Sequence, residues 1–118
     1  MTPGELRQTD YISHMLEAAI LAQSYVDGIN KTDFLHDKKT QQAVILNIMV
    51  IGEAATKLAD EYPEFVAKFP QVQWKSMRGM RNRLAHGYFD INLDVVWETV
   101  RQALPELESQ LRQIQKSL

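Results

Sequence analysis

The chain has 118 residues, a length typical of one domain, and we predict a single domain over residues 1–118. Its hydrophobic fraction of 45% and charged fraction of 24% are ordinary for a globular protein, which argues against disordered and fibrous classes. Since it has no cysteine, it can form no disulfide, no thiolate zinc site and no cysteine nucleophile.

The net charge of −2 hides an uneven distribution of charges. Residues 65–89 contain five basic and no acidic side chains, whereas the rest of the chain has eight basic and fifteen acidic residues, a net charge of −7. Nucleic-acid-binding proteins concentrate positive charge in this way. The basic segment is therefore the first candidate for a functional site.

Two features suggest where the protein resides. Residues 1–5 lack the basic and apolar regions of a secretory signal. The most apolar stretch, residues 43–55, is interrupted by Asn47, Gly52 and Glu53 and is too short to span a bilayer. We expect a cytoplasmic protein with no membrane partner.

Apolar residues recur at steps of three and four from Tyr11 onward, which predicts a first helix over about residues 8–27. Thr9 or Asp10 can accept hydrogen bonds from the first free amides of this helix. Gly28 can adopt the left-handed conformation that ends many helices.

The widest apolar stripe predicts a long helix over residues 37–62. Thr32 or Asp33 is a second helix start signal just before it, with room for a short helical turn over Phe34 and Leu35. A stripe of this width must be buried on more than one side. The helix should end before Pro63, because a proline disfavours the helical conformation of the preceding residue. Pro63 then suits the first turn of a short helix over residues 64–69.

Two further helices complete the prediction. One covers about residues 74–85, and the other follows an N-cap at Asn92 and runs over residues 93–118. Pro105 should bend or break the last helix in the turn before it. No stretch alternates in the way of a β-strand. The expected fold is all-α, an up-and-down bundle of four to five helices.

The basic segment contains the run from Arg81 to Tyr88. Arg81 and His86 are five residues apart, so on one continuous helix they would point about 140° from each other. A left-handed turn at Gly87 would relieve this conflict, because it would end the helix near Ala85 or His86 and redirect His86 and Tyr88. We therefore expect such a turn.

The residue types in this run suit RNA cleavage without a metal or other cofactor. An imidazole such as His86 can take the proton of a ribose 2′-OH as that oxygen attacks phosphorus. The guanidinium of Arg81 can stabilise the charge of the transition state, and Arg78 and Arg83 can contact further phosphates. The chemistry alone leaves a structural alternative open, because basic side chains near the end of a helix also stabilise its dipole. Tyr88 is either packed in the core or an exposed phenol.

Several other residues have two interpretations. Glu53 lies in the apolar stretch and is either a buried, hydrogen-bonded carboxylate or a functional one. Trp74 and Trp97 are expected to be core or dimer anchors rather than base-stacking platforms. Gly79 is unfavourable within a helix, which suggests close packing against another helix.

The pattern Arg81-x4-His86-x-Tyr88 resembles the signature of the HEPN superfamily, and its tyrosine is similar to that of the HepT branch. Three flanking segments resemble the same branch: residues 51–55, 74–82 and 94–97. The resemblance extends over about residues 10–107.

The resemblance implies a metal-independent endoribonuclease toxin of a type VII toxin–antitoxin system, with an all-helical bundle. It implies a homodimer, with further assembly left open, in which two motifs meet in one cleft. Arg81 and His86 would be the catalytic pair acting on an RNA substrate. Asn82, the polar residue after the arginine, would support the site together with Arg78.

The resemblance also implies a partner, a minimal nucleotidyltransferase of the MNT type that acts as the antitoxin. It would neutralise the toxin by transferring AMP from ATP to Tyr88. The alternative is a non-catalytic subunit that binds a substrate or docks onto a nucleotidyltransferase.

Overall fold

The computed structural model describes residues 6–118, so the stretch used above to argue against a secretory signal lies outside it. The described part contains no strand, which confirms the all-α prediction. Its α-helices are α1 (Gln8–Tyr25), α2 (Lys31–Leu35), α3 (Lys38–Glu61), α4 (Pro63–Ala67), α5 (Trp74–His86), α6 (Leu93–Glu98) and α7 (Leu104–Ser117). A 3₁₀ turn, η1 (Tyr88–Asp90), follows α5, and a π-helical turn, η2 (Thr99–Ala103), joins α6 to α7.

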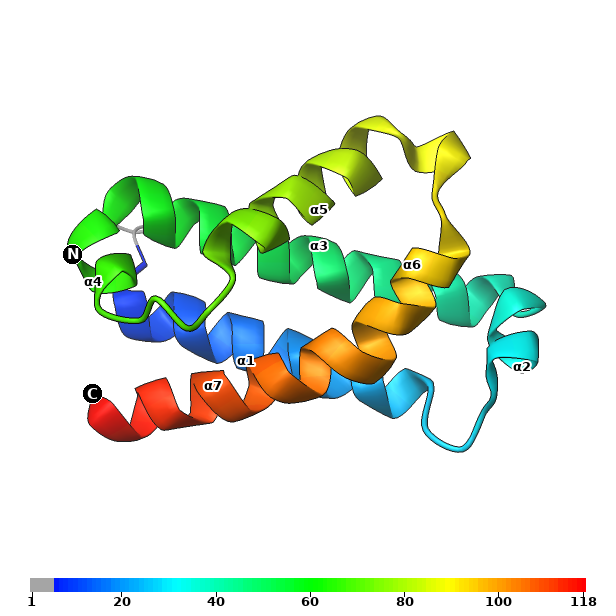
Figure 1. The fold of residues 1–118 in the computed structure, drawn as a ribbon, viewed down its shortest axis with the longest axis horizontal. Coiled ribbons are helices and arrows are strands. Elements are labelled where there is room, and N and C mark those ends of the chain that lie inside the picture. The colour runs from blue at the N-terminus through cyan, green and yellow to red at the C-terminus, as the bar shows by residue number, and fades with distance from the viewer. Residues whose placement is uncertain (1–5) are drawn as a thin grey trace.

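Four long segments form the up-and-down bundle that the sequence predicts: α1, α3, α5 and the continuous run α6–η2–α7 (Figure 1). α3 lies between α1 and α5 and packs against both, while α7 packs against α1. The chief neighbour of α5 in the bundle is α3. The position of the basic helix α5 is therefore set by its contact with α3.

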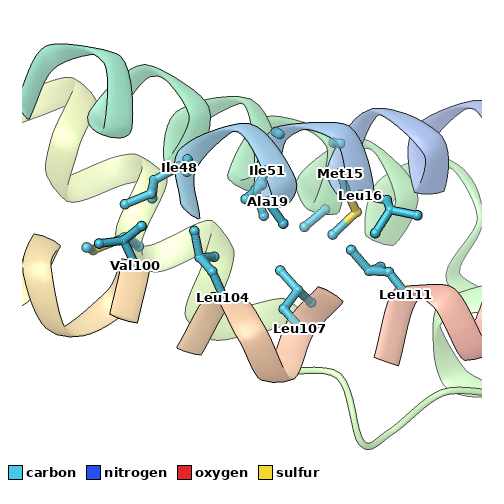
Figure 2. Close-up of a cluster of buried hydrophobic side chains, with 14 of the residues drawn as sticks. Met15, Leu16, Ala19, Ile48, Ile51, Val100, Leu104, Leu107 and Leu111 are labelled. Carbon is cyan, nitrogen blue, oxygen red and sulfur yellow. The ribbon is translucent and has the colours of Figure 1, made fainter. Parts of the chain in front are cut away.

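The core lies between α1, α3 and the α6–η2–α7 run. Side chains from these three segments point toward one another there (Figure 2). Burial of each large aliphatic side chain stabilises the fold by about 1.5–3 kcal/mol relative to its exposure. The labelled members are Met15, Leu16, Ala19, Ile48, Ile51, Val100, Leu104, Leu107 and Leu111.

α3 confirms the predicted long helix over residues 37–62 to within one residue at each end. Its apolar part is longer than residues 43–55, on which the argument against a membrane span was based. By length and composition alone α3 could cross a membrane. The core helix of a soluble protein has the same properties, and here eight residues of α3 are buried within the bundle. This burial on two sides agrees with the wide apolar stripe seen in the sequence.

α1 begins at Gln8, as predicted, but the caps of α1 and α2 lie two or three residues before the predicted Thr9 or Asp10 and Thr32 or Asp33. α1 begins after Arg7, whose N–H donates to the Asp10 carboxylate at 2.9 Å. α2 begins after Asn30, whose side chain accepts the Asp33 N–H at 2.8 Å. Each acidic residue lies in the first turn and reaches back to the cap, as in a capping box. The left-handed conformation predicted for Gly28 is confirmed, with a φ of 78°.

The last segment bends where Pro105 predicts. The turn η2 is a π-helix, in which the Leu104 N–H bonds to the Thr99 carbonyl, and Pro105 follows in the first turn of α7. Proline has no N–H to donate, so a wider turn before it lets the helix continue. The predicted cap at Asn92 is also confirmed, because its side chain accepts the N–H groups of Asp94 and Val95.

Candidate active site

α3 and α5 approach each other closely at Gly52. A Cβ atom added there would overlap the Cβ of Arg81 and lie 2.8 Å from the Met77 carbonyl oxygen. The prediction that Gly79 marks a close helix contact is wrong, because a Cβ there would meet only the Arg83 guanidinium, at 3.8 Å. The small residue that this packing requires is on α3, opposite the point where the Arg81 side chain leaves α5.

Arg81 is held against α3 by two polar groups. Its Nη1 lies 3.2 Å from the Glu53 carboxylate, and its Nη2 donates to the Thr56 hydroxyl at 3.4 Å. Its Nε is buried and has no hydrogen-bond partner among the described residues. The side chain is 27% exposed. Arg81 is thus a restrained arginine whose side chain is still partly exposed.

Thr56 connects Arg81 to the second arginine of the site, Arg78. Its hydroxyl donates to the Gly52 carbonyl at 2.8 Å and accepts from the Arg78 Nε at 3.5 Å. Arg78 also forms an ion pair with Asp60. One threonine therefore lies between the two guanidinium groups and orients both.

Sequence reasoning missed Thr56 and Asp60 as parts of this site. It considered Glu53, but the alternative of a buried carboxylate is wrong, because the side chain is 52% exposed and paired with Arg81. The signal that could have found them is their spacing, since steps of three and four residues place all three on one face of α3. The carboxylates of Glu53 and Asp60 partly neutralise the charge of the basic segment.

His86 is the last residue of α5 and is exposed to solvent. The left-handed turn predicted at Gly87 is wrong, because its φ is −118°, whereas the predicted end of the helix near Ala85 or His86 is confirmed. Gly87 instead prolongs the helical hydrogen bonding, its N–H donating to the Arg83 carbonyl at 2.9 Å. Arg81 and His86 therefore keep the divergence of about 140° expected on a continuous helix. Within one chain the structure does not bring them together.

Tyr88 is the exposed phenol of the two alternatives, with a side chain 48% exposed. It opens the turn η1, and its hydroxyl accepts a hydrogen bond from the Gln42 side chain at 3.3 Å. Phe89 beside it is 98% exposed. The end of α5 therefore presents two aromatic rings to solvent.

The remaining predicted residues lie around this helix. Asn82 is exposed one turn before His86, on the same side of α5. Trp74 belongs to the core, and its indole N–H donates to the Phe69 carbonyl at 3.0 Å. Trp97 is partly buried and packs against Phe34. Within the described residues, no three histidine, aspartate or glutamate side chains lie close enough to hold a metal ion.

Residues 15–114, which include both α3 and the run from Arg81 to Tyr88, match a protein-family model described as "Ribonuclease HepT-like". The chain belongs to the HepT-like ribonuclease family. The matched residues include Gly52 and the other α3 residues that contact Arg81, as well as the run from Arg81 to Tyr88.

The names of three relatives agree with this family. A protein of Thermococcus cleftensis named "Probable ribonuclease HepT" is 35% identical to this HepT-like chain over 91% of the chain and 94% of the relative. "Putative RNase TTE0752" of Caldanaerobacter subterraneus is 36% identical over 88% and 90%. "Putative RNase MJ0127" of Methanocaldococcus jannaschii is 42% identical over 80% and 75%. No solved structure matches the chain significantly.

Proposed function

We propose that this HepT-like protein is an endoribonuclease toxin that cleaves RNA through attack by the ribose 2′-OH, without a metal ion. The observation that carries the proposal is the restrained, partly exposed Arg81 on the same helix as an exposed His86. An arginine fork matches phosphate oxygens, and a histidine exchanges protons near neutral pH. RNA is the substrate, and the proposed location is the cytoplasm.

The proposed reaction needs two proton transfers. The imidazole of His86 takes the proton of the 2′-OH while its oxygen attacks the adjacent phosphorus, and Arg81 stabilises the added negative charge. The bond from phosphorus to the 5′-oxygen then breaks, and this oxygen takes the same proton from the imidazolium of that His86, which is neutral again at the end of the reaction. The products are a 2′,3′-cyclic phosphate and a 5′-hydroxyl. Asn82 and Arg78 support the site beside this pair.

The divergence of Arg81 and His86 supports a homodimer. Along α3, Gln42 contacts Tyr88 and Glu53 contacts Arg81, and between these two contacts lie the exposed apolar side chains of Leu46 and Val50. An apolar surface that borders a polar site is typical of protein interfaces. We propose that a second copy covers this surface and brings its own His86 to Arg81.

The mechanism is tested with the purified protein, free of any partner, in a buffer containing EDTA. We expect it to cut an RNA oligonucleotide into fragments with 2′,3′-cyclic phosphate and 5′-hydroxyl ends, which mass spectrometry identifies. The matched oligonucleotide with 2′-O-methyl groups at every position should stay intact, because it has no attacking hydroxyl. Binding of RNA without any cleavage would favour the non-catalytic subunit instead.

Tyr88 supports a mechanism of neutralisation. Its phenol is exposed and lies two residues from His86. In the proposed step the phenol oxygen attacks the α-phosphorus of ATP on an MNT-type nucleotidyltransferase, pyrophosphate leaves, and the phenol proton is lost to solvent. The tyrosine then carries AMP, whose phosphate and nucleoside occupy the space that RNA needs beside Arg81 and His86.

Modification at this tyrosine is measured by intact mass after incubation with the nucleotidyltransferase, ATP and Mg²⁺. We expect wild-type protein to gain mass in steps of one AMP and to lose RNA cleavage in parallel, whereas Tyr88→Phe gains none. Tyr25→Phe is the matched control, because Tyr25 is also exposed, at 40%, but lies at the end of α1. An unchanged mass gain in Tyr88→Phe would identify another acceptor.

A further inference from the structure

Two carboxylates of α3 face the two arginines of α5. Glu53 pairs with Arg81, and Asp60 pairs with Arg78, while Thr56 lies between the two arginines. The positive charge that marks this segment in the sequence is therefore partly balanced by another helix.

Glu53 contacts Arg81 from one side only. Its Oε2 lies 3.2 Å from Nη1, and the side chain is half exposed. Exposed ion pairs of this kind are weak, because water solvates both partners and the side chains lose freedom on pairing. A phosphate can instead accept two parallel hydrogen bonds from one guanidinium. Phosphate and Glu53 would compete for the same donors.

Thr56 keeps the guanidinium in place when Glu53 is displaced. Its hydroxyl accepts from Nη2, whereas the carboxylate pairs with Nη1, and the hydroxyl is itself fixed by the Gly52 carbonyl. The aliphatic part of Arg81 lies against Gly52, which has no side chain to push it away. The arginine is thus oriented by groups that bear no charge. Glu53 is therefore the contact of Arg81 that an incoming anion can replace.

We propose that Glu53 is a displaceable counter-ion of Arg81, whose carboxylate a phosphate of the RNA backbone replaces on binding. This inference rests on the proposed function in taking RNA as the ligand. Glu53 then weakens RNA binding by direct competition and by repulsion of the incoming phosphate. Thr56 is the positioning residue that preserves the orientation of Arg81 after the exchange.

Binding of the 2′-O-methyl RNA, which cannot be cut, tests the inference in a low-salt buffer. We expect Glu53→Gln to bind it about fivefold tighter than wild type, the factor that corresponds to about 1 kcal/mol of repulsion between unit charges about 4 Å apart in water. The gain should shrink as salt is added, because salt screens exposed charges. In cleavage of unmodified RNA, KM should fall by a similar factor while kcat stays within about twofold.

Glu17→Gln is the matched control, since it changes the net charge equally at an exposed position on α1. It should leave RNA binding within about twofold of wild type. In an Arg81→Ala background, Glu53→Gln should no longer improve binding, because the group it competes for is gone. Equal or weaker binding of RNA by Glu53→Gln, in protein with an unchanged melting temperature, overturns the inference.

The two proposals fail separately. Wild-type protein that binds the 2′-O-methyl RNA but cuts no unmodified RNA would refute the proposed nuclease activity and leave the Glu53 comparison intact. Cleavage that proceeds normally while Glu53→Gln shows no gain in binding would refute only the role of Glu53 as a counter-ion.

Discussion

Alanine at either Arg81 or His86 should lower the rate of RNA cleavage by at least about 100-fold, and mixing the two inactive variants should restore part of the activity. The loss is expected because a positioned general base contributes about 100- to 10,000-fold and a charge-stabilising donor a similar factor. Cleavage of a labelled RNA by equal amounts of each variant measures it. Thermal unfolding of each variant verifies that the fold is unchanged, since His86 is exposed and its loss should not affect the core.

The recovery on mixing follows from the divergence of the two side chains along α5. If Arg81 of one chain works with His86 of the other, a mixed dimer has one site with neither group and one site with both. In a two-fold symmetric dimer with random exchange, about a quarter of wild-type activity should return in the unfractionated mixture and about half in isolated mixed dimers. If both groups came from one chain, no mixed dimer would have a complete site.

The exchange needs a control for subunit mixing. The two variants carry different affinity tags and are mixed at mild denaturant concentration, and dimers that bind both resins are isolated for the assay. Each variant mixed with itself should stay inactive. Mixed dimers that form but do not cleave would contradict a site shared between chains.

Apolar spacing was enough to predict the helical fold, because a bundle is determined mainly by which face of each helix is apolar. The long segment of α3 and the bend before Pro105 both follow from local rules of this kind. The error at Gly87 has a different cause. A glycine permits a left-handed turn but does not require it, and here the Gly87 N–H continues the helix by bonding to Arg83.

Only part of the candidate site could be predicted from the sequence. Arg81 and His86 lie in one basic run, so their residue types and spacing could be read directly. The groups that hold Arg81 are on α3, and residue spacing shows that Glu53 and Thr56 share a face but not what that face contacts. That contact is set by Gly52, through a close approach between helices that local sequence rules do not describe.

Gly52→Ala should destabilise the protein by about 2 kcal/mol, although alanine is the better helix former by about 1 kcal/mol. The added methyl group would overlap the Cβ of Arg81 and lie 2.8 Å from the Met77 carbonyl oxygen. Neither is the end of a flexible side chain, so α5 has to move away from α3. Urea unfolding followed by circular dichroism measures the change in the free energy of unfolding.

Gly79→Ala is the matched control and should have the opposite sign. Its Cβ would meet only the Arg83 guanidinium, at 3.8 Å, so the gain in helix propensity of about 0.5–1 kcal/mol should appear as added stability. The rate of RNA cleavage should also differ between the two variants. Gly52→Ala should lose activity even at temperatures where it stays folded, because the displaced Arg81 no longer reaches Thr56, whereas Gly79→Ala should retain it. Equal stability of both variants would mean that the Gly52 contact does not hold α5 in place.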